Sequence, residues 1–183
     1  PSGVFTRVEV AAWVRGTADA EAALVKRALA AGEVIRIYRG LYCLGNRYRS
    51  RPVDSLAVAQ RIAGPSYVSL EAALAFHGWL PEAVETVTSV CDVRSRQVQT
   101  PIGWFRFDRV PQRTLFAGVS RVPRADGQAA FIATPLKALA DYVSVHRADW
   151  SGAEPLIESL RLPPTCLTEI DPTQTTALAA TYR

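Results

Sequence analysis

The chain has 183 residues, a net charge of +4 and an apolar content of 49%, which is ordinary for a globular protein. No apolar run approaches the roughly 20 residues that a membrane-spanning helix needs, and no charged start followed by an apolar stretch marks a secretion signal. Three widely spaced cysteines, Cys43, Cys91 and Cys166, are typical of reduced thiols. We therefore expect a soluble, cytoplasmic protein.

A first helix is expected directly after Thr6. The residues Thr6-Arg7-Val8-Glu9 have the form of a capping box, in which the threonine hydroxyl accepts a hydrogen bond from the backbone N–H three residues on. Three apolar side chains follow at helical spacing and are expected to face inward: Val10, Trp13 and Val14.

A second helix is expected after the break at Gly16. Thr17 or Asp19 can cap its start, and Gly32 is well placed to end it. Four apolar side chains are expected to form its buried face: Leu24, Val25, Ala28 and Leu29. Lys26 and Arg27 lie elsewhere on its surface.

A tight basic hairpin is expected over residues 33–45. Side chains 34–38 alternate from side to side, Arg39-Gly40 forms the turn, and residues 41–44 lead back. Helix, turn, helix and basic hairpin form the layout of a winged helix-turn-helix, in which the second helix enters a major groove of DNA. There is no room before Thr6 for the helix that usually opens such a domain, so the helical pattern of residues 53–63 is expected to support it.

Basic residues are concentrated near the N-terminus, as phosphate binding requires. Residues 1–52 contain nine bases and four acids, a net charge of +5, whereas the rest of the chain contains twelve bases and thirteen acids. A solvated surface without a ligand is the alternative interpretation. The side chains expected to contact DNA are Thr6, Arg7, Thr17, Lys26, Arg27, Arg36, Arg39 and Arg47.

The sequence after Gly64-Pro65 predicts a mixed α+β domain. Helices are expected near residues 69–78, 136–145, 154–160 and 175–182, with Ser69 as a cap, and strands near 86–93, 104–110, 115–122 and 128–132, with a turn at Asp126-Gly127. The strands are grouped between helices, so the fold class is α+β. The predicted domains are a winged helix-turn-helix over 1–50, a linking helix over 51–65 and an α+β domain over 66–183.

No arrangement of residues indicates catalysis. Metal-dependent nucleases often carry an acid two residues before a lysine, but the two lysines, Lys26 and Lys137, follow Leu24 and Pro135 at that distance. The chain also lacks a phosphate-binding glycine loop and a paired-cysteine motif. We therefore expect no enzyme, no metal and no cofactor, with a nuclease as the less favoured alternative.

Polar residues of the second half favour structural roles. His77 is interpreted as a residue that ends a helix, in preference to a proton carrier. Lys137 and Asp141 are spaced four residues apart, so we expect them to form a solvated ion pair on one helix face.

Several short segments are together similar to one protein family. They are Phe5-Thr6-Arg7, Tyr38-Arg39-Gly40-Leu41-Tyr42, residues 68–74, His77-Gly78, Pro81-Glu82, residues 100–103 and residues 133–141. In this order and spacing they resemble the AbiEi-type antitoxins of bacterial type IV toxin–antitoxin systems. Leu136 departs from the pattern, because an acidic residue is usual at that position.

The resemblance implies two activities. An N-terminal winged helix would repress the promoter of the protein's own operon, and a C-terminal domain would oppose a nucleotidyltransferase-like toxin. The implied partners are double-stranded DNA and that toxin. The alternative is a protein-interaction module whose winged helix does not read DNA, because the alanine-rich second helix lacks the Asn, Gln and Arg cluster that usually contacts bases.

Overall fold

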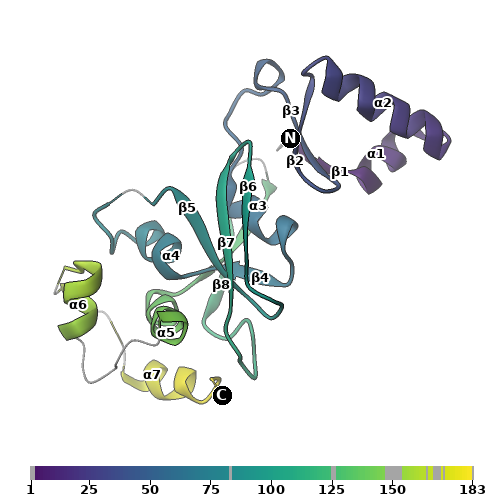
Figure 1. Ribbon diagram of the computed structural model, residues 1–183. Helices are drawn as coiled ribbons and strands as arrows, with labels where there is room; N and C mark the ends of the chain where they lie inside the picture. Colours follow the sequence, from purple (N-terminus) through teal and green to yellow (C-terminus); the bar gives the residue numbers. More distant parts are fainter. Residues whose placement is uncertain are drawn as a thin grey trace.

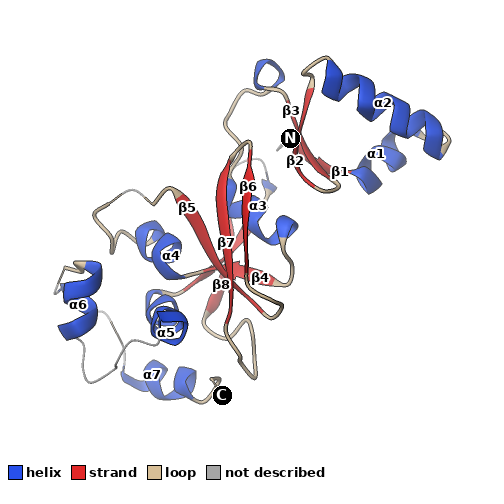
Figure 2. Ribbon diagram, in the orientation of Figure 1, coloured by secondary structure: helices blue, strands red, loops and turns tan. Residues whose placement is uncertain are grey.

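The computed structural model describes residues 3–82, 84–124, 127–146, 154–163, 165–166, 170 and 172–182. These residues form two sheets with accompanying helices, a mixed α+β fold as predicted (Figures 1 and 2). Within these ranges, no helix combines the length and the apolar character needed to cross a membrane.

The smaller sheet is built from three strands near the N-terminus. They are β1 (Val4–Thr6), β2 (Val34–Tyr38) and β3 (Leu41–Leu44), in the antiparallel order β1-β3-β2. Helices α1 (Arg7–Val14) and α2 (Ala18–Ala30) connect β1 to β2, and a short 3-10 helix, η1 (Asn46–Tyr48), follows β3. The hairpin has the predicted bounds, and Gly40 turns it at a φ of 74°, which glycine adopts without strain.

Both helices of this region begin where the sequence predicts. Thr6 and Glu9 form the complete capping box, in which the Thr6 N–H donates to Glu9 Oε2 at 2.6 Å and the Glu9 N–H donates back to Thr6 Oγ1. The Thr17 hydroxyl caps α2 by accepting a hydrogen bond from the Ala20 N–H. The Arg7 N–H donates to the carbonyl of Gly40 at 3.1 Å, so the start of α1 is joined to the hairpin turn.

The smaller sheet buries side chains on both of its faces, because successive residues of a strand point to opposite sides. Phe5 and Tyr42 share one face and form a small core with Val10 of α1. Val4 and Cys43 share the other face and belong to the cluster that continues into the larger sheet. The smaller sheet therefore connects two cores.

The predicted apolar faces of α1 and α2 are only partly buried. On α1, the Trp13 side chain is 65% exposed. On α2, Leu24 is 39% exposed and Val25 and Leu29 are half-buried. No residue of α2 is fully buried. The physical reason is the size of the sheet, since three short strands cannot cover both helices. Trp13 lies against Phe5, with ring centroids 5.7 Å apart, at the margin of the small core.

The larger sheet has six strands in the order β6-β7-β5-β4-β9-β8. The strands are β4 (Ser66–Val68), β5 (Thr86–Cys91), β6 (Arg96–Thr100), β7 (Gly103–Arg109), β8 (Val119–Pro123) and β9 (Ala129–Ala133). β5 runs parallel to β7 and β4 parallel to β9, and the other neighbours are antiparallel. The strand predicted from residue 115 begins at Val119, and Asp126 of the predicted turn lies outside the described residues.

Helices cover this sheet and extend beyond it. They are α3 (Ser55–Ile62), α4 (Leu70–Phe76), α5 (Pro135–His146), α6 (Glu154–Leu160) and α7 (Pro172–Ala179). Figure 1 shows α4 and α5 together on one side of the sheet and α3 on the other. The last helix begins three residues earlier than predicted. The core between sheet and helices contains Tyr67, Phe105 and Phe107, which are fully buried.

The start of α4 differs from the prediction. Ser69 precedes the helix, but its side chain does not cap it. Thr88 on β5 does so instead, because its hydroxyl accepts from the Ala72 N–H at 3.0 Å and donates to the Ser69 carbonyl at 2.7 Å. Leu70 adopts a φ of 56°, which is rare for leucine. The Ser69 hydroxyl donates to Asp141 at 2.7 Å.

Lys137 and Asp141 form a buried ion pair, so the prediction of a solvated pair is wrong. Both side chains are 0% exposed, and Lys137 Nζ lies 3.1 Å from Asp141 Oδ1. Further donors to the carboxylate are Tyr67, Ser69, Gln112 and Tyr182. We call these six side chains the polar core network. Helical spacing places Lys137 and Asp141 on one face, but only the packing of β4 and the C-terminal residues covers that face.

The lysine of the polar core network uses all of its donors. Lys137 Nζ donates to Asp141, to Gln112 Oε1 at 2.5 Å and to the Tyr182 hydroxyl at 2.8 Å. Burial lowers the pKa of the Lys137 ammonium, while Asp141 acts in the opposite direction. Burial, reinforced by the charge of Asp141, raises the pKa of Tyr67 and Tyr182 well above their ordinary value.

Asp141→Ala should lower the free energy of unfolding by about 3–5 kcal/mol, because it leaves the Lys137 ammonium buried without its counter-charge. Glu82→Ala is the matched control, since the Glu82–Arg161 pair is 73% and 78% exposed and is expected to contribute less than about 1 kcal/mol. Urea unfolding followed by circular dichroism measures both. Equal losses in the two variants would contradict a structural role for the network.

Stability should fall as the pH rises above 10, the ordinary tyrosine pKa. Folding raises the pKa of Tyr67 and Tyr182, so their contribution is complete below the unfolded pKa and is lost as pH rises through the folded pKa. Urea midpoints measured across alkaline pH should therefore decline less steeply in Tyr182→Phe. Tyr48→Phe is the control, because Tyr48 is 50% exposed and lies outside the network. An identical decline in Tyr182→Phe and the unsubstituted protein would refute the assignment.

Candidate nucleic-acid interface

Three of the predicted DNA contacts converge on one cavity. Arg7 at the start of α1, Lys26 on α2 and Arg36 on β2 line a hollow of about 240 Å³. Its other described lining residues are apolar or aromatic: Ala22, Val25, Leu29 and Tyr42. Three basic residues therefore line the cavity, and no acidic residue is among its described lining residues.

The positions of these bases follow from the local structure. Arg36 pairs with Tyr42 across the hairpin, so both side chains lie on the sheet face that carries the small core. The Arg36 guanidinium lies 5.8 Å from the centroid of the Tyr42 ring, which supports it from one side. The backbone bond from Arg7 to Gly40 holds the first base beside the hairpin. Such a cluster of donors can bind a phosphate oxygen.

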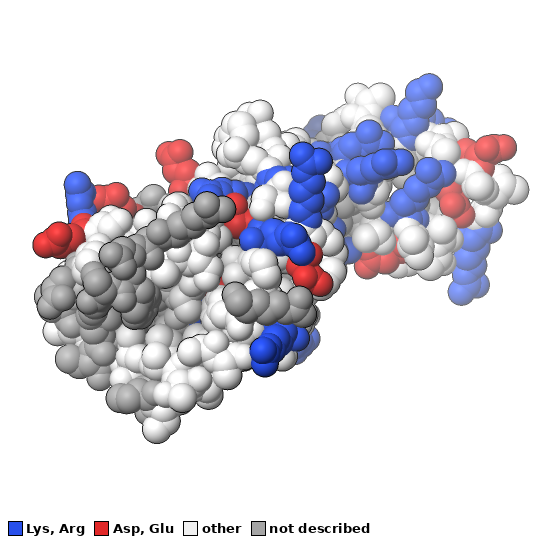
Figure 3. Space-filling view, turned by 60° about the horizontal axis from the view of Figure 1, so that its bottom comes forward, with Lys and Arg blue, Asp and Glu red and all other residues white. Residues whose placement is uncertain are grey.

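The other predicted DNA contacts lie outside this cavity. Arg27, Arg39 and Arg47 are exposed on α2, at the hairpin turn and in η1 respectively, and Arg47 lies 5.7 Å from the ring centroid of Tyr48. Figure 3 shows lysine and arginine side chains gathered at the end of the molecule formed by the N-terminal elements. These bases add to the positive charge of the N-terminal region.

The two threonines predicted to contact DNA act in helix caps. The Thr6 hydroxyl donates to Glu9 Oε2 at 2.7 Å and accepts from the Glu9 N–H, and the Thr17 hydroxyl accepts from the Ala20 N–H. Their hydroxyls therefore set the starts of α1 and α2. They position the neighbouring bases through those helices.

Glu9 is the acid closest in sequence to Arg7, and its charge is already compensated. Arg61 on α3 lies 2.9 Å from its carboxylate, and the same guanidinium donates to the Val4 carbonyl at 3.2 Å. The hydrogen bonds from Thr6 lower the pKa of Glu9; burial opposes them, and the charge of Arg61 adds a smaller lowering effect. Arg61 thereby connects the N-terminal elements to the helix that packs on the larger sheet.

A second, apolar cavity of about 540 Å³ lies over the small core. It is lined mainly by apolar side chains that include Phe5, Val10, Trp13, Val14, Leu24 and Val25. The sequence prediction missed it, because helical spacing placed Trp13, Val14 and Leu24 inside the core. A single exposed tryptophan can be missed easily, since spacing alone does not reveal how much of a helix its sheet will cover.

The acidic, histidine and cysteine side chains do not gather into a metal site in the part of the chain that the structure describes. No group of three or more His, Cys, Asp or Glu side chains there could hold a metal ion. The His77 ring contacts Phe76 edge-on, and its Nε2 lies 2.9 Å from the Ala133 carbonyl. This contact fits the structural interpretation of His77.

Comparisons with known proteins do not assign the chain to a family. No protein-family model matches it, and no curated protein matches it significantly. The interpretation of the basic cavity therefore rests on its geometry and charge.

Glu9→Gln should destabilise the protein at neutral pH and reduce its sensitivity to acid. Folding lowers the pKa of Glu9 below 4.5, so the stability it contributes is present above the unfolded pKa and is lost as pH falls through the folded value. Urea midpoints from neutral pH to about pH 3 measure this loss. Glu33→Gln, at an exposed acid before β2, should keep the dependence of the unsubstituted protein. An unchanged acid profile in Glu9→Gln would contradict a stabilising role for the Glu9 carboxylate.

Proposed function

We propose that this protein is a DNA-binding transcriptional repressor in which residues 1–50 act as a winged helix-turn-helix. The observation that carries the proposal is the convergence of Arg7, Lys26 and Arg36 on one cavity. These bases come from two helices and the hairpin, so a phosphate bound there would contact all three elements at once. Phosphate contacts of this kind determine how a protein is positioned on a duplex.

The order of the elements supports the same proposal. Strand, helix, helix and hairpin, with β1 paired to β3, agree with the layout in which the second helix enters a major groove and the hairpin contacts a neighbouring backbone. Helix α2 carries Lys26 and Arg27 and buries none of its residues completely, so it is accessible to a ligand. Because α2 is rich in alanine, recognition would depend on the hairpin and on DNA shape.

The resemblance to AbiEi-type antitoxins extends the proposal. The repressor would regulate the promoter of its own operon and act as the antitoxin of a type IV toxin–antitoxin system. The α+β region after residue 65 would oppose a nucleotidyltransferase-like toxin, without catalysis. The basic N-terminal surface supports the DNA-binding half of this proposal, and the sequence resemblance alone supports the antitoxin half.

The alternative function is that of a protein-interaction module. It is favoured by the apolar cavity around Trp13, where a side chain that is 65% exposed borders the small core. Such a module would neutralise a toxin equally well after Arg36→Ala or Arg39→Ala. A repressor would lose control of its promoter through the same substitutions.

Fluorescence anisotropy on the protein's own upstream DNA tests the proposal, with scrambled DNA as the competitor and a series of salt concentrations. Arg7→Ala, Lys26→Ala and Arg36→Ala should each weaken binding and reduce the salt slope by about one charge. Arg121→Ala is the matched control, because Arg121 is an exposed arginine on β8, outside the N-terminal region. Equal and weak binding to both DNAs, or an equal loss in Arg121→Ala, would contradict a repressor.

A further inference from the structure

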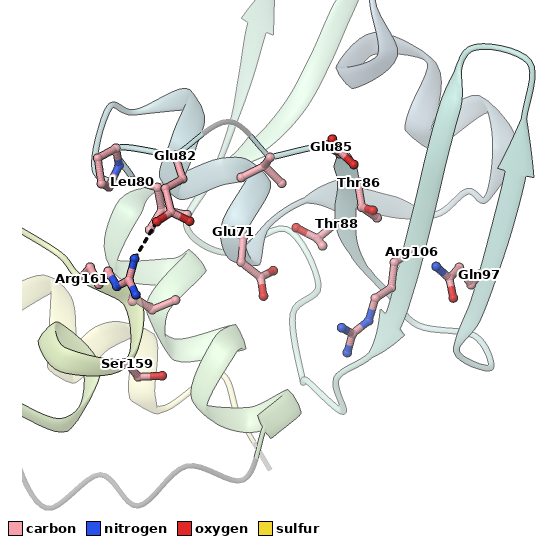
Figure 4. Close-up of a pocket in the computed structure, with 13 residues that line it drawn as sticks. Glu71, Leu80, Glu82, Glu85, Thr86, Thr88, Gln97, Arg106, Ser159 and Arg161 are labelled. Atoms are coloured by element: carbon pink, nitrogen blue, oxygen red, sulfur yellow. Dashed lines mark hydrogen bonds and ion pairs between the residues drawn. The ribbon is translucent and has the colours of Figure 1, made fainter.

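We propose that the cavity between α4, α6 and strands β5–β7 binds an arginine side chain within a peptide segment of a partner protein. This cavity has a volume of about 720 Å³ and lies in the α+β region, apart from the basic N-terminal surface. Figure 4 shows polar side chains entering it from two walls, one helical and one formed by the sheet. The proposal does not depend on DNA binding.

The helical wall presents a carboxylate that is incompletely paired. Glu71 lies in the first turn of α4, its side chain is 27% exposed, and Figure 4 shows it extending into the cavity. Its Oε2 is buried and accepts no hydrogen bond from the described residues, while its Oε1 lies 3.8 Å from His146 Nε2. A carboxylate that is incompletely supplied with donors is unfavourable, and the side chain is partly exposed, so this wall suits a ligand that brings donors.

The sheet wall presents donors. Thr86 on β5, Gln97 on β6 and Arg106 on β7 line it, and Figure 4 shows the Arg106 guanidinium pointing into the open space that Glu71 also enters. Arg106 Nε forms an ion pair with Asp108 Oδ2 at 2.7 Å. The hydroxyl of Thr86 and the amide of Gln97 make no hydrogen bond with another described residue. A ligand that carries acceptors beside its cation would pair with the carboxylate of the helical wall and with the donors of the sheet wall.

The charges around the cavity favour a cation. Both lining arginines already have carboxylate partners, because Arg106 pairs with Asp108 and Arg161 with Glu82 at 2.9 Å. Glu71 and Glu85 remain, so the cavity is negative in a chain whose overall charge is +4.

The two walls together select arginine within a peptide. A guanidinium is planar and presents several N–H donors, which suits a carboxylate such as that of Glu71. The peptide carbonyls on either side would accept from Thr86, Gln97 and Arg106. A free polyamine supplies the cation but no acceptors, so the sheet wall would stay unsatisfied. β6 is the edge strand of the sheet, which leaves one side of the cavity open to an extended segment.

Nuclear magnetic resonance titration of the full chain with three probes tests the proposal. The probes are acetyl-glycyl-arginyl-glycinamide, the same peptide with uncharged citrulline in place of arginine, and spermidine. The arginine peptide should shift the resonances of Glu71, Thr86 and Arg106 in a saturable way. The citrulline peptide lacks the positive charge that Glu71 attracts, and spermidine lacks the acceptors that the sheet wall requires. Each should therefore bind about tenfold more weakly than the arginine peptide.

Glu71→Gln provides the second test, because it keeps the size of the side chain and removes its charge. It should weaken the arginine peptide about tenfold, whereas Glu33→Gln, far from the cavity, should not. DNA binding should be unchanged in Glu71→Gln, which separates this proposal from that of a repressor. Equal binding of the citrulline peptide or spermidine, or shifts confined to other acidic residues, would overturn the proposal.

Discussion

The buried pair of Lys137 and Asp141 is the interaction that joins the larger sheet, α5 and the C-terminal residues. Two charges removed from water are tolerated only when their remaining hydrogen-bonding groups are satisfied, and here Asp141 is reached from β4, from the start of α4 and from the C-terminal residues. Tyr182 is thereby held against α5, although it lies at the end of the chain. The network also explains why Ser69 does not cap α4, because its hydroxyl donates a hydrogen bond to Asp141 instead.

The N-terminal elements have a different basis for stability. Their three-stranded sheet is too small to enclose a core, so it buries one face beneath α1 and α2 and contributes the other face to the larger core. Arg61 reinforces this junction through Glu9 and the Val4 carbonyl. The same shortage of covering surface leaves α2 accessible, together with its two bases, Lys26 and Arg27.

Two cavities of opposite charge are the basis of the two recognition surfaces that we propose. The first is formed by bases from α1, α2 and the hairpin and suits phosphate, whereas the second presents Glu71 and suits a cation. They lie in different parts of the fold, so DNA and a basic peptide would not compete for the same atoms. A repressor that also binds a protein partner needs such a separation.

The local features of this protein were determined by its sequence. The capping box at Thr6, the hairpin with its turn at Gly40 and the α+β class could all be predicted, because caps, turns and alternation depend on neighbouring residues. Only the tertiary structure decided which faces are covered. Spacing places Trp13 on an apolar face and Lys137 on a polar one, yet Trp13 is exposed and Lys137 is buried. Their exposure depends on contacts with strands and chain termini that are distant in the sequence, and a local sequence pattern does not predict such contacts.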